Sequence, residues 1–87
     1  MVAKKNIGII GAGYWGLNLV RNFNKLGVLK IVADLDIRRK KKVSDISIAL
    51  NFTTDYRNIL KDDTIKAVVI STSAKTIIPF SPTTTIL

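Results

Sequence analysis

A glycine-rich stretch near the N-terminus constrains the fold of this chain more than any other feature of its sequence. Residues 6–20 read NIGIIGAGYWGLNLV, an apolar run followed by glycines at 11, 13 and 16 and then by an amphipathic segment. The spacing G-x-G-x-x-G between a strand and a helix is typical of the turn that receives the diphosphate of a dinucleotide. We therefore predict a strand over Ile7–Ile10, a glycine turn, and a helix that begins at Tyr14.

Each of the three glycines has a separate physical reason to be there. Gly11 lets the chain leave the strand through a turn that a Cβ would obstruct. Gly13 leaves room for a pyrophosphate against the backbone, and Gly16 lets the helix pack closely on the strand. The free N–H groups and the positive dipole end of the helix then face the phosphates. The alternative is a glycine-rich turn that serves packing only.

An aspartate stands where a second part of such a site is expected. Val28 to Ala33 is a β-branched apolar run that predicts a strand, and Asp34 follows it, 18 positions after Gly16. An acidic residue about 20 positions on accepts hydrogen bonds from the adenosine ribose. Because a carboxylate repels a 2′-phosphate, Asp34 favours NAD over NADP, and nearby Arg38 and Arg39 soften that preference. Asp34 could instead cap the next helix, for which Asp36 is the better candidate.

The rest of the chain alternates between predicted strands and helices, which favours an α/β fold. We expect half of a Rossmann-type, doubly wound parallel sheet with the strand order 3-2-1-4. Ligands bind at the carboxyl ends of the central strands, so Ser71 and Thr72, just past the last strand, are candidate lining residues, or else an ordinary polar loop. The remaining elements are predicted at Tyr14–Leu26, Ile37–Leu50, a short strand around Phe52, Asp55–Leu60 and Ile65–Ile70.

A chain of 87 residues is long enough for one domain at most. It is strongly basic, with a formal net charge of +8. Part of the excess lies in the run RRKKK at residues 38–42. We interpret this run as a solvated helix face. The alternative is a small basic interaction module that binds an acidic partner or nucleic acid. Nucleic acid is the less favoured partner because no aromatic side chains are interleaved with the charges.

The residue types that are absent narrow the possible chemistry. The sequence contains no cysteine, no histidine and no glutamate. Disulfides, zinc-finger spacings, Cys–His nucleophile pairs and every triad that depends on histidine are therefore excluded, and we assign neither a catalytic residue nor a metal site. No apolar run approaches the ~18 residues that span a bilayer, and no signal peptide is recognised. We expect a cytoplasmic protein with no membrane partner.

Several segments together resemble the glucose–fructose oxidoreductase / inositol dehydrogenase (Gfo/Idh/MocA) family, especially its members that act on nucleotide-linked sugars. The segments, which span roughly residues 4–76, are NIGIIGAGYWG at 6–16, NLVRNF at 18–23, IVADLD at 31–36, TDY at 54–56 and AVVIST at 67–72. The resemblance implies an NAD-binding Rossmann domain of an enzyme that oxidises or reduces sugar and polyol carbons. It also implies that Ala12, Tyr14 and Trp15 lie against the pyrophosphate and nicotinamide, and that Thr72 lies beside the cofactor.

The last part of the chain departs from the family. Ser73 replaces an expected proline, Ile77 stands where histidine is usual, and the Glu-Lys-Pro segment with the family's catalytic lysine and the substrate domain are missing. We predict a dinucleotide-binding domain over residues 1–76 and a non-matching, irregular or extended tail over 77–87, in a truncated and catalytically incomplete chain. An uncovered edge at the last strand predicts a homo-oligomer, most simply a two-fold dimer.

Overall fold

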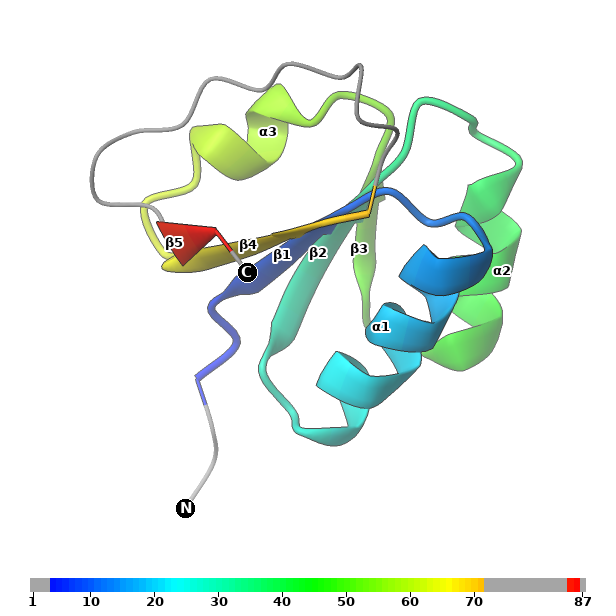
Figure 1. Cartoon of the computed structure of the whole chain (residues 1–87), viewed down its shortest axis with the longest axis horizontal. Helices are drawn as coiled ribbons and strands as arrows, with labels where there is room; N and C mark the ends of the chain where they lie inside the picture. The colour runs from blue at the N-terminus through cyan, green and yellow to red at the C-terminus, as the bar shows by residue number, and fades with distance from the viewer. Residues whose placement is uncertain (1–3, 72–84, 87) are drawn as a thin grey trace.

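The structure, a computed structural model that describes residues 4–71 and 85–86, is built on one parallel sheet. The strand order β3-β2-β1-β4-β5 confirms the predicted order 3-2-1-4 and adds a fifth strand (Figure 1). The elements are β1 (Ile7–Ile10), α1 (Tyr14–Lys25), β2 (Leu29–Ala33), α2 (Arg39–Ile46), β3 (Asn51–Thr53), α3 (Arg57–Leu60), β4 (Ala67–Ile70) and β5 (Thr85–Ile86).

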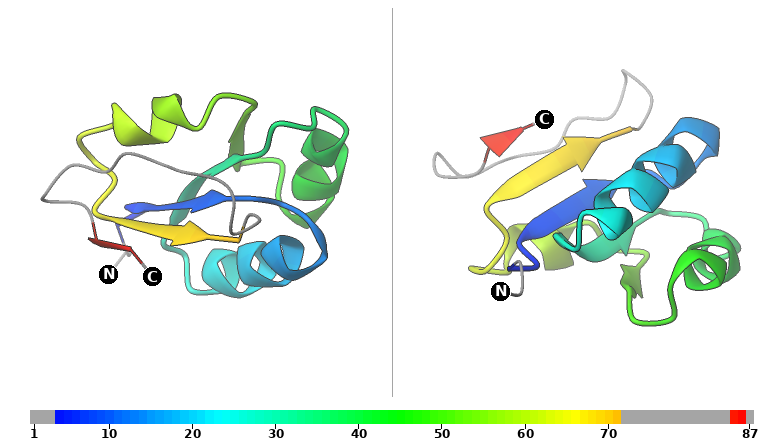
Figure 2. Two further views of the ribbon diagram at one scale, coloured as in Figure 1. Left: turned by 45° about the horizontal axis from the view of Figure 1, so that its top comes forward. Right: turned by 90° about the horizontal axis from the view of Figure 1, so that it is seen from below.

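Helices cover both faces of the sheet, with α1 and α2 on one face and α3 on the other (Figures 1 and 2). Successive strand residues point to opposite faces, so each central strand contributes to two cores. In β1, Ile9 packs into the core beneath α1 and α2, and its neighbour Ile10 packs into the core beneath α3. This explains why the strands are apolar almost without alternation, as the sequence indicated.

Helix α2 is shorter than predicted, because it begins at Arg39 and ends at Ile46 instead of covering Ile37–Leu50. Its first turn contains no acidic residue, so basic side chains lie at the positive end of the helix dipole and destabilise the start. At the other end, Ser47 adopts an extended conformation and stops the helix. Leu50 still lies in the core, from a position outside the helix.

The outer edge of β4 is partly covered, where the sequence predicted a free edge. Ala67 and Val68 pair in parallel with Thr85 and Ile86 of β5. This agrees with the extended conformation that was one of the two expectations for residues 77–87. The proline-containing part of that tail, and Thr72, lie outside the described residues. Within the part of the chain that is described, no helix is long and apolar enough to cross a bilayer.

Candidate functional site

The glycine turn closes tightly against the first turn of α1. Gly11 has φ 105°, a conformation that favours glycine, and its N–H donates to the Ala33 carbonyl at 2.7 Å. A Cβ on Gly16 would lie 2.0 Å from the Gly11 carbonyl oxygen. Gly16 is therefore required because the helix approaches the backbone of Gly11 closely. We predicted a close contact with the strand itself, which ends one residue earlier, at Ile10.

Gly13 differs from both of these glycines. Its φ of −73° suits any residue, and a Cβ built on it would meet no atom of the described protein within 4 Å. Neither backbone conformation nor packing within the described residues accounts for a glycine here. The position faces open space at the start of α1, where a side chain would occupy room next to the helix terminus.

The start of α1 has unpaired hydrogen-bond donors. Gly13 is the N-cap residue, and no side chain caps the helix. Within residues 4–71 and 85–86, the N–H groups of Tyr14, Trp15 and Gly16 donate to no protein acceptor. Such donors, together with the helix dipole, make the N-terminus of a helix a ready site for an anion. The unobstructed Cβ position of Gly13 belongs to the cap residue that directly precedes these donors.

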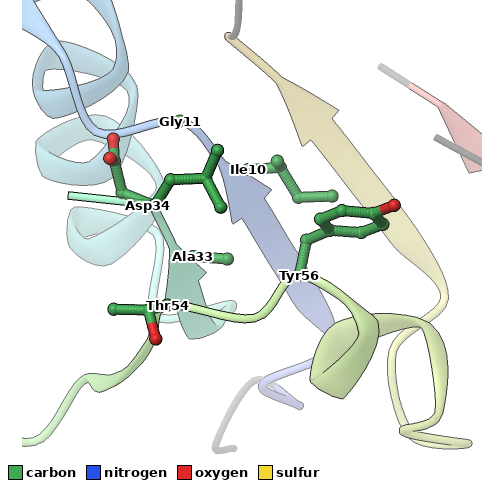
Figure 3. Close-up of a pocket in the computed structure, with 7 residues that line it drawn as sticks. Ile10, Gly11, Ala33, Asp34, Thr54 and Tyr56 are labelled. Atoms are coloured by element: carbon green, nitrogen blue, oxygen red, sulfur yellow. The ribbon is translucent and has the colours of Figure 1, made fainter. Parts of the chain in front are cut away.

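Asp34 lies against the glycine turn (Figure 3). Its Oδ2 accepts the N–H of Ala12 at 2.7 Å, and its Oδ1 accepts the N–H of Asp36 at 2.8 Å. An ionised carboxylate offers about four acceptor positions, so these two bonds leave others free for a ligand. The carboxylate thus ties the end of β2 to the turn after β1 and remains partly exposed to solvent.

A small cavity of about 170 Å³ opens beside Asp34 at the carboxyl end of the sheet. Because ligand pockets commonly measure ~300–1,000 Å³, this cavity suits one ring or one sugar of a larger ligand. Most of its lining is apolar, and Figure 3 shows that it is formed by residues from the ends of β1 and β2 and from the segment after β3. The lining residues are Ile10, Gly11, Ala33, Asp34, Leu35, Thr54 and Tyr56.

Arg38 does not line this cavity. Its Nε and Nη2 each lie 2.9 Å from an oxygen of Asp36, and its side chain is 87% exposed. The hydrogen bonds from Arg38 lower the pKa of the Asp36 carboxyl below its ordinary value. Asp36 also accepts the Arg38 N–H at 3.0 Å and so stabilises the turn that leads into α2, close to the capping role predicted for it.

The other predicted residues lie around the same turn. Tyr14 and Trp15 are 81% and 72% exposed, and their rings meet edge to face with centroids 6.0 Å apart. The Ser71 N–H donates to the Ile10 carbonyl at 2.8 Å, which holds the residue beside the end of β1. Among the described residues, no group of three acidic side chains is arranged to hold a metal ion.

The residues that sequence reasoning missed come from the segment after β3. Thr54 and Tyr56 line the cavity, yet neither was predicted to be a site residue. The available signal was their position, because every segment that follows a parallel strand reaches the same edge of the sheet.

Comparison with protein-family models matches residues 5–81 to GFO_IDH_MocA, an oxidoreductase family with an NAD-binding Rossmann fold. The chain belongs to this family. No curated protein matches the sequence. The glycine turn, the strand order and Asp34 of this Gfo/Idh/MocA chain therefore lie in a domain whose family binds NAD.

Three solved structures illustrate which proteins share this fold. GenD2 from gentamicin A biosynthesis, in complex with NAD, superposes with a TM-score of 0.68 at 23% identity, over 83% of this chain and 21% of that one. Levoglucosan dehydrogenase in complex with NADH and levoglucosan superposes with a TM-score of 0.64 at 22% identity, over 80% of this chain and 22% of that one. An NAD binding oxidoreductase from Klebsiella pneumoniae superposes with a TM-score of 0.53 at 22% identity, over 82% of this chain and 22% of that one. The Gfo/Idh/MocA chain spans about a fifth of the length of these structures.

Proposed function

We propose that this Gfo/Idh/MocA chain binds NAD, with the pyrophosphate over Gly13 and against the first turn of α1. The observation that carries the proposal is the open space at Gly13 in front of an uncapped helix N-terminus. A diphosphate fits such a place because it accepts hydrogen bonds from the free N–H groups and is attracted by the helix dipole.

The adenosine half would lie beside Asp34. The free acceptor positions of its carboxylate suit the ribose hydroxyl groups, and the adjoining cavity of about 170 Å³ suits the adenine ring. A carboxylate at this position repels a 2′-phosphate, which supports NAD as the ligand rather than NADP. Tyr14, Trp15, Ser71 and Thr72 remain our candidates for the nicotinamide half of the site.

We further propose that the chain is the cofactor-binding part of a dehydrogenase for sugars or polyols, in keeping with its family. When bound, the nicotinamide supplies the hydride acceptor. A carbinol substrate also needs a group that accepts its proton. Around the turn and the adjoining cavity, the polar side chains in the part of the chain that the structure describes are those of Tyr14, Asp34, Thr54, Tyr56 and Ser71, and Asp34 already accepts two N–H groups. None of them has a convincing claim to be this base. We therefore expect no turnover of sugars by this chain alone.

The alternative of a basic interaction module has weaker support. Lys40, Lys41 and Lys42 are exposed, while Val43, the next residue of α2, is buried. Consecutive residues of a helix point about 100° apart, so the charges of the run spread around much of α2, and Arg38, Arg39 and Lys42 are the ones that line a common hollow.

The test of NAD binding is calorimetric titration of the whole chain with NADH. We expect binding by the wild type and a loss of at least tenfold in affinity for Gly13→Val, because the new side chain enters the space assigned to the pyrophosphate. The fold should survive, since the substituted position contacts no described atom, and circular dichroism will check this. Asp34→Ala should weaken binding more than Lys41→Ala, the exposed control. Absence of NADH binding at millimolar concentration would refute the proposal.

A further inference from the structure

Next to the adenosine part of the site, an aspartate holds an arginine that could otherwise bind a phosphate. Asp36 receives three hydrogen bonds from the Arg38 guanidinium, from Nε to Oδ1 at 2.9 Å, from Nε to Oδ2 at 3.2 Å and from Nη2 to Oδ2 at 2.9 Å. The Arg38 N–H donates to Oδ1 at 3.0 Å. The edge of the guanidinium that would form a two-pronged contact with a phosphate is therefore occupied by a carboxylate.

This pair is connected to the carboxylate assigned to the ribose. The Asp36 N–H donates to Asp34 Oδ1 at 2.8 Å, and Asp34 Oδ2 in turn accepts the Ala12 N–H. A short chain of hydrogen bonds thus runs from the glycine turn through Asp34 and Asp36 to Arg38. A hollow of about 280 Å³ adjoins it, lined by Asp36, Arg38, Arg39 and Lys42. Three cationic side chains surround this hollow, and Asp36 is its acidic member.

We propose that Asp36 adds to the cofactor specificity that Asp34 provides, because it holds Arg38 and cancels its charge, so that the 2′-phosphate of NADP binds less tightly. This inference rests on the proposed binding of NAD beside Asp34. A 2′-phosphate entering the site would meet the carboxylates of Asp34 and Asp36, both of its own sign, and an Arg38 already engaged. Without the Asp36 charge, Arg38 is free to turn toward the phosphate, with Arg39 and Lys42 nearby.

The size of the effect follows from the exposure of the pair. An ion pair on the surface contributes roughly a fivefold factor at most to an equilibrium, because water and salt screen it. Removing Asp36 also removes one repulsive charge near the phosphate. We therefore expect a gain in NADPH affinity of about five- to tenfold at low ionic strength, which declines as salt is added.

The test is Asp36→Asn in the full chain, titrated calorimetrically with NADPH and with NADH. Asparagine keeps an oxygen that can accept the Arg38 N–H, so the turn before α2 is retained while the charge is lost. NADPH affinity should rise about five- to tenfold relative to the wild type, and NADH affinity should stay within about twofold. The double variant Asp36→Asn/Arg38→Gln should lose the gain, because the released guanidinium is then absent.

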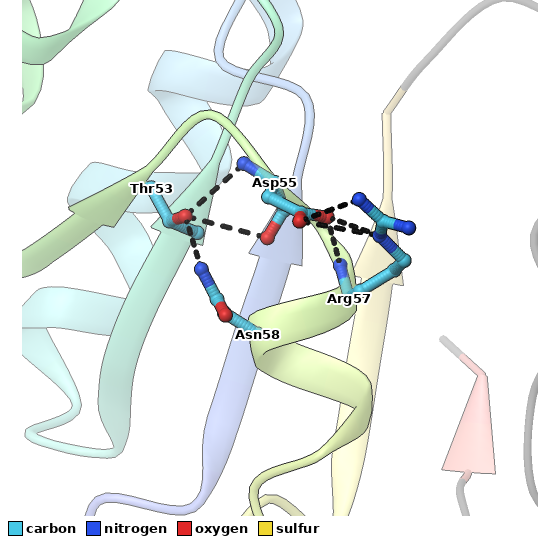
Figure 4. A network of polar contacts seen from close by, with 4 residues as sticks. All are labelled: Thr53, Asp55, Arg57 and Asn58. Carbon is cyan, nitrogen blue, oxygen red and sulfur yellow. Dashed lines mark hydrogen bonds and ion pairs between the residues drawn. The ribbon is translucent and has the colours of Figure 1, made fainter.

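The chain offers a matched control in a second pair of the same geometry (Figure 4). The Arg57 Nε donates to Asp55 Oδ1 at 2.9 Å and to Oδ2 at 3.2 Å, and Nη2 donates to Oδ2 at 2.9 Å. The backbone N–H of Arg57 donates to Asp55 Oδ1 at 3.0 Å. The Asp55 N–H and carbonyl contact the Thr53 hydroxyl, not Asp34. Asp55→Asn changes the net charge by the same amount and should leave the NADPH affinity unchanged.

The outcomes separate this inference from the proposed function. If the wild type binds NADH and Asp36→Asn does not improve NADPH binding, Asp36 has no role in specificity and NAD binding stands. An equal gain from Asp55→Asn would mean a general effect of net charge and would overturn the inference. If the wild type binds neither nucleotide, both the site and the inference resting on it are refuted.

Discussion

Three glycines within six residues of the turn differ in what a side chain would meet at each. At Gly11 the obstacle is the backbone conformation, with φ 105°. At Gly16 the obstacle is a carbonyl oxygen 2.0 Å from the Cβ position. At Gly13 a Cβ would meet no atom of the described protein within 4 Å. The motif predicted all three positions. It could not predict that Gly16 meets the Gly11 carbonyl, or that Asp36 engages Arg38, because those contacts depend on the path of the turn and on rotamers.

Substitution of Gly16 should test the turn without involving a ligand. Gly16→Ala forces its methyl group against backbone, which cannot move aside as a flexible side chain would, so we expect a loss of about 2–3 kcal/mol in the free energy of unfolding. Urea denaturation of this variant and of Gly13→Ala will measure it. Gly13→Ala should change the stability by less than about 1 kcal/mol, and equal losses in the two variants would contradict the assigned roles.

At the scale of elements, β1, β2, β4 and α1 lie within two residues of their predicted bounds, because each carries a clear apolar pattern. Helix α2 was predicted too long, because Leu50 continues the apolar spacing of Val43 and Ile46, although Ser47 ends the helix. Lys30 of β2 forms an ion pair with Asp62, in which its Nζ lies 2.6 Å from Asp62 Oδ2, and this pair ties β2 to the turn before β4.

Because of this ion pair, we expect the free energy of unfolding to fall at low pH. Hydrogen bonds from Lys30 and Thr64 lower the pKa of Asp62 from 3.8 to about 2. Because the folded-state pKa is the lower one, the stabilisation is complete above pH 3.8 and is lost as the pH falls through about 2. Asp62→Asn should reduce the free energy of unfolding by about 1 kcal/mol near pH 6, a difference that vanishes near pH 2.

Denaturation curves of the Asp62→Asn variant between pH 2 and pH 7 will follow that difference. Asp63→Asn is the matched control, because Asp63 is the adjacent residue and is more exposed, and its carboxylate joins no ion pair in the described ranges. A loss for Asp62→Asn that is independent of pH would show that the side chain contributes through packing alone.

At the scale of the whole molecule, topology followed from the order of elements, since right-handed crossovers leave one arrangement of four parallel strands. The pairing of β5 with β4 could not be predicted in the same way. Two residues, Thr85 and Ile86, carry too little pattern to reveal a partner strand, and only the assembled sheet provides one. The oligomeric state remains a prediction.

We expect a homo-oligomer, most simply a two-fold dimer, with residues 83–87 or β4 at the contact. In the described part of the chain, β5 pairs with Ala67 and Val68 and leaves the edge at Val69 and Ile70 without a strand partner. An open edge of a sheet is a template for another copy. Light scattering coupled to gel filtration should give twice the chain mass of 9.6 kDa. A mass that stays at the single-chain value at high concentration would contradict the expectation.

The bond between Ala12 and Asp34 joins residues 22 positions apart and uses no atom from outside the chain. At the site proposed for the dinucleotide, contacts within the chain thus hold the turn and the carboxylate together, which reduces the ordering entropy that binding of a ligand would cost.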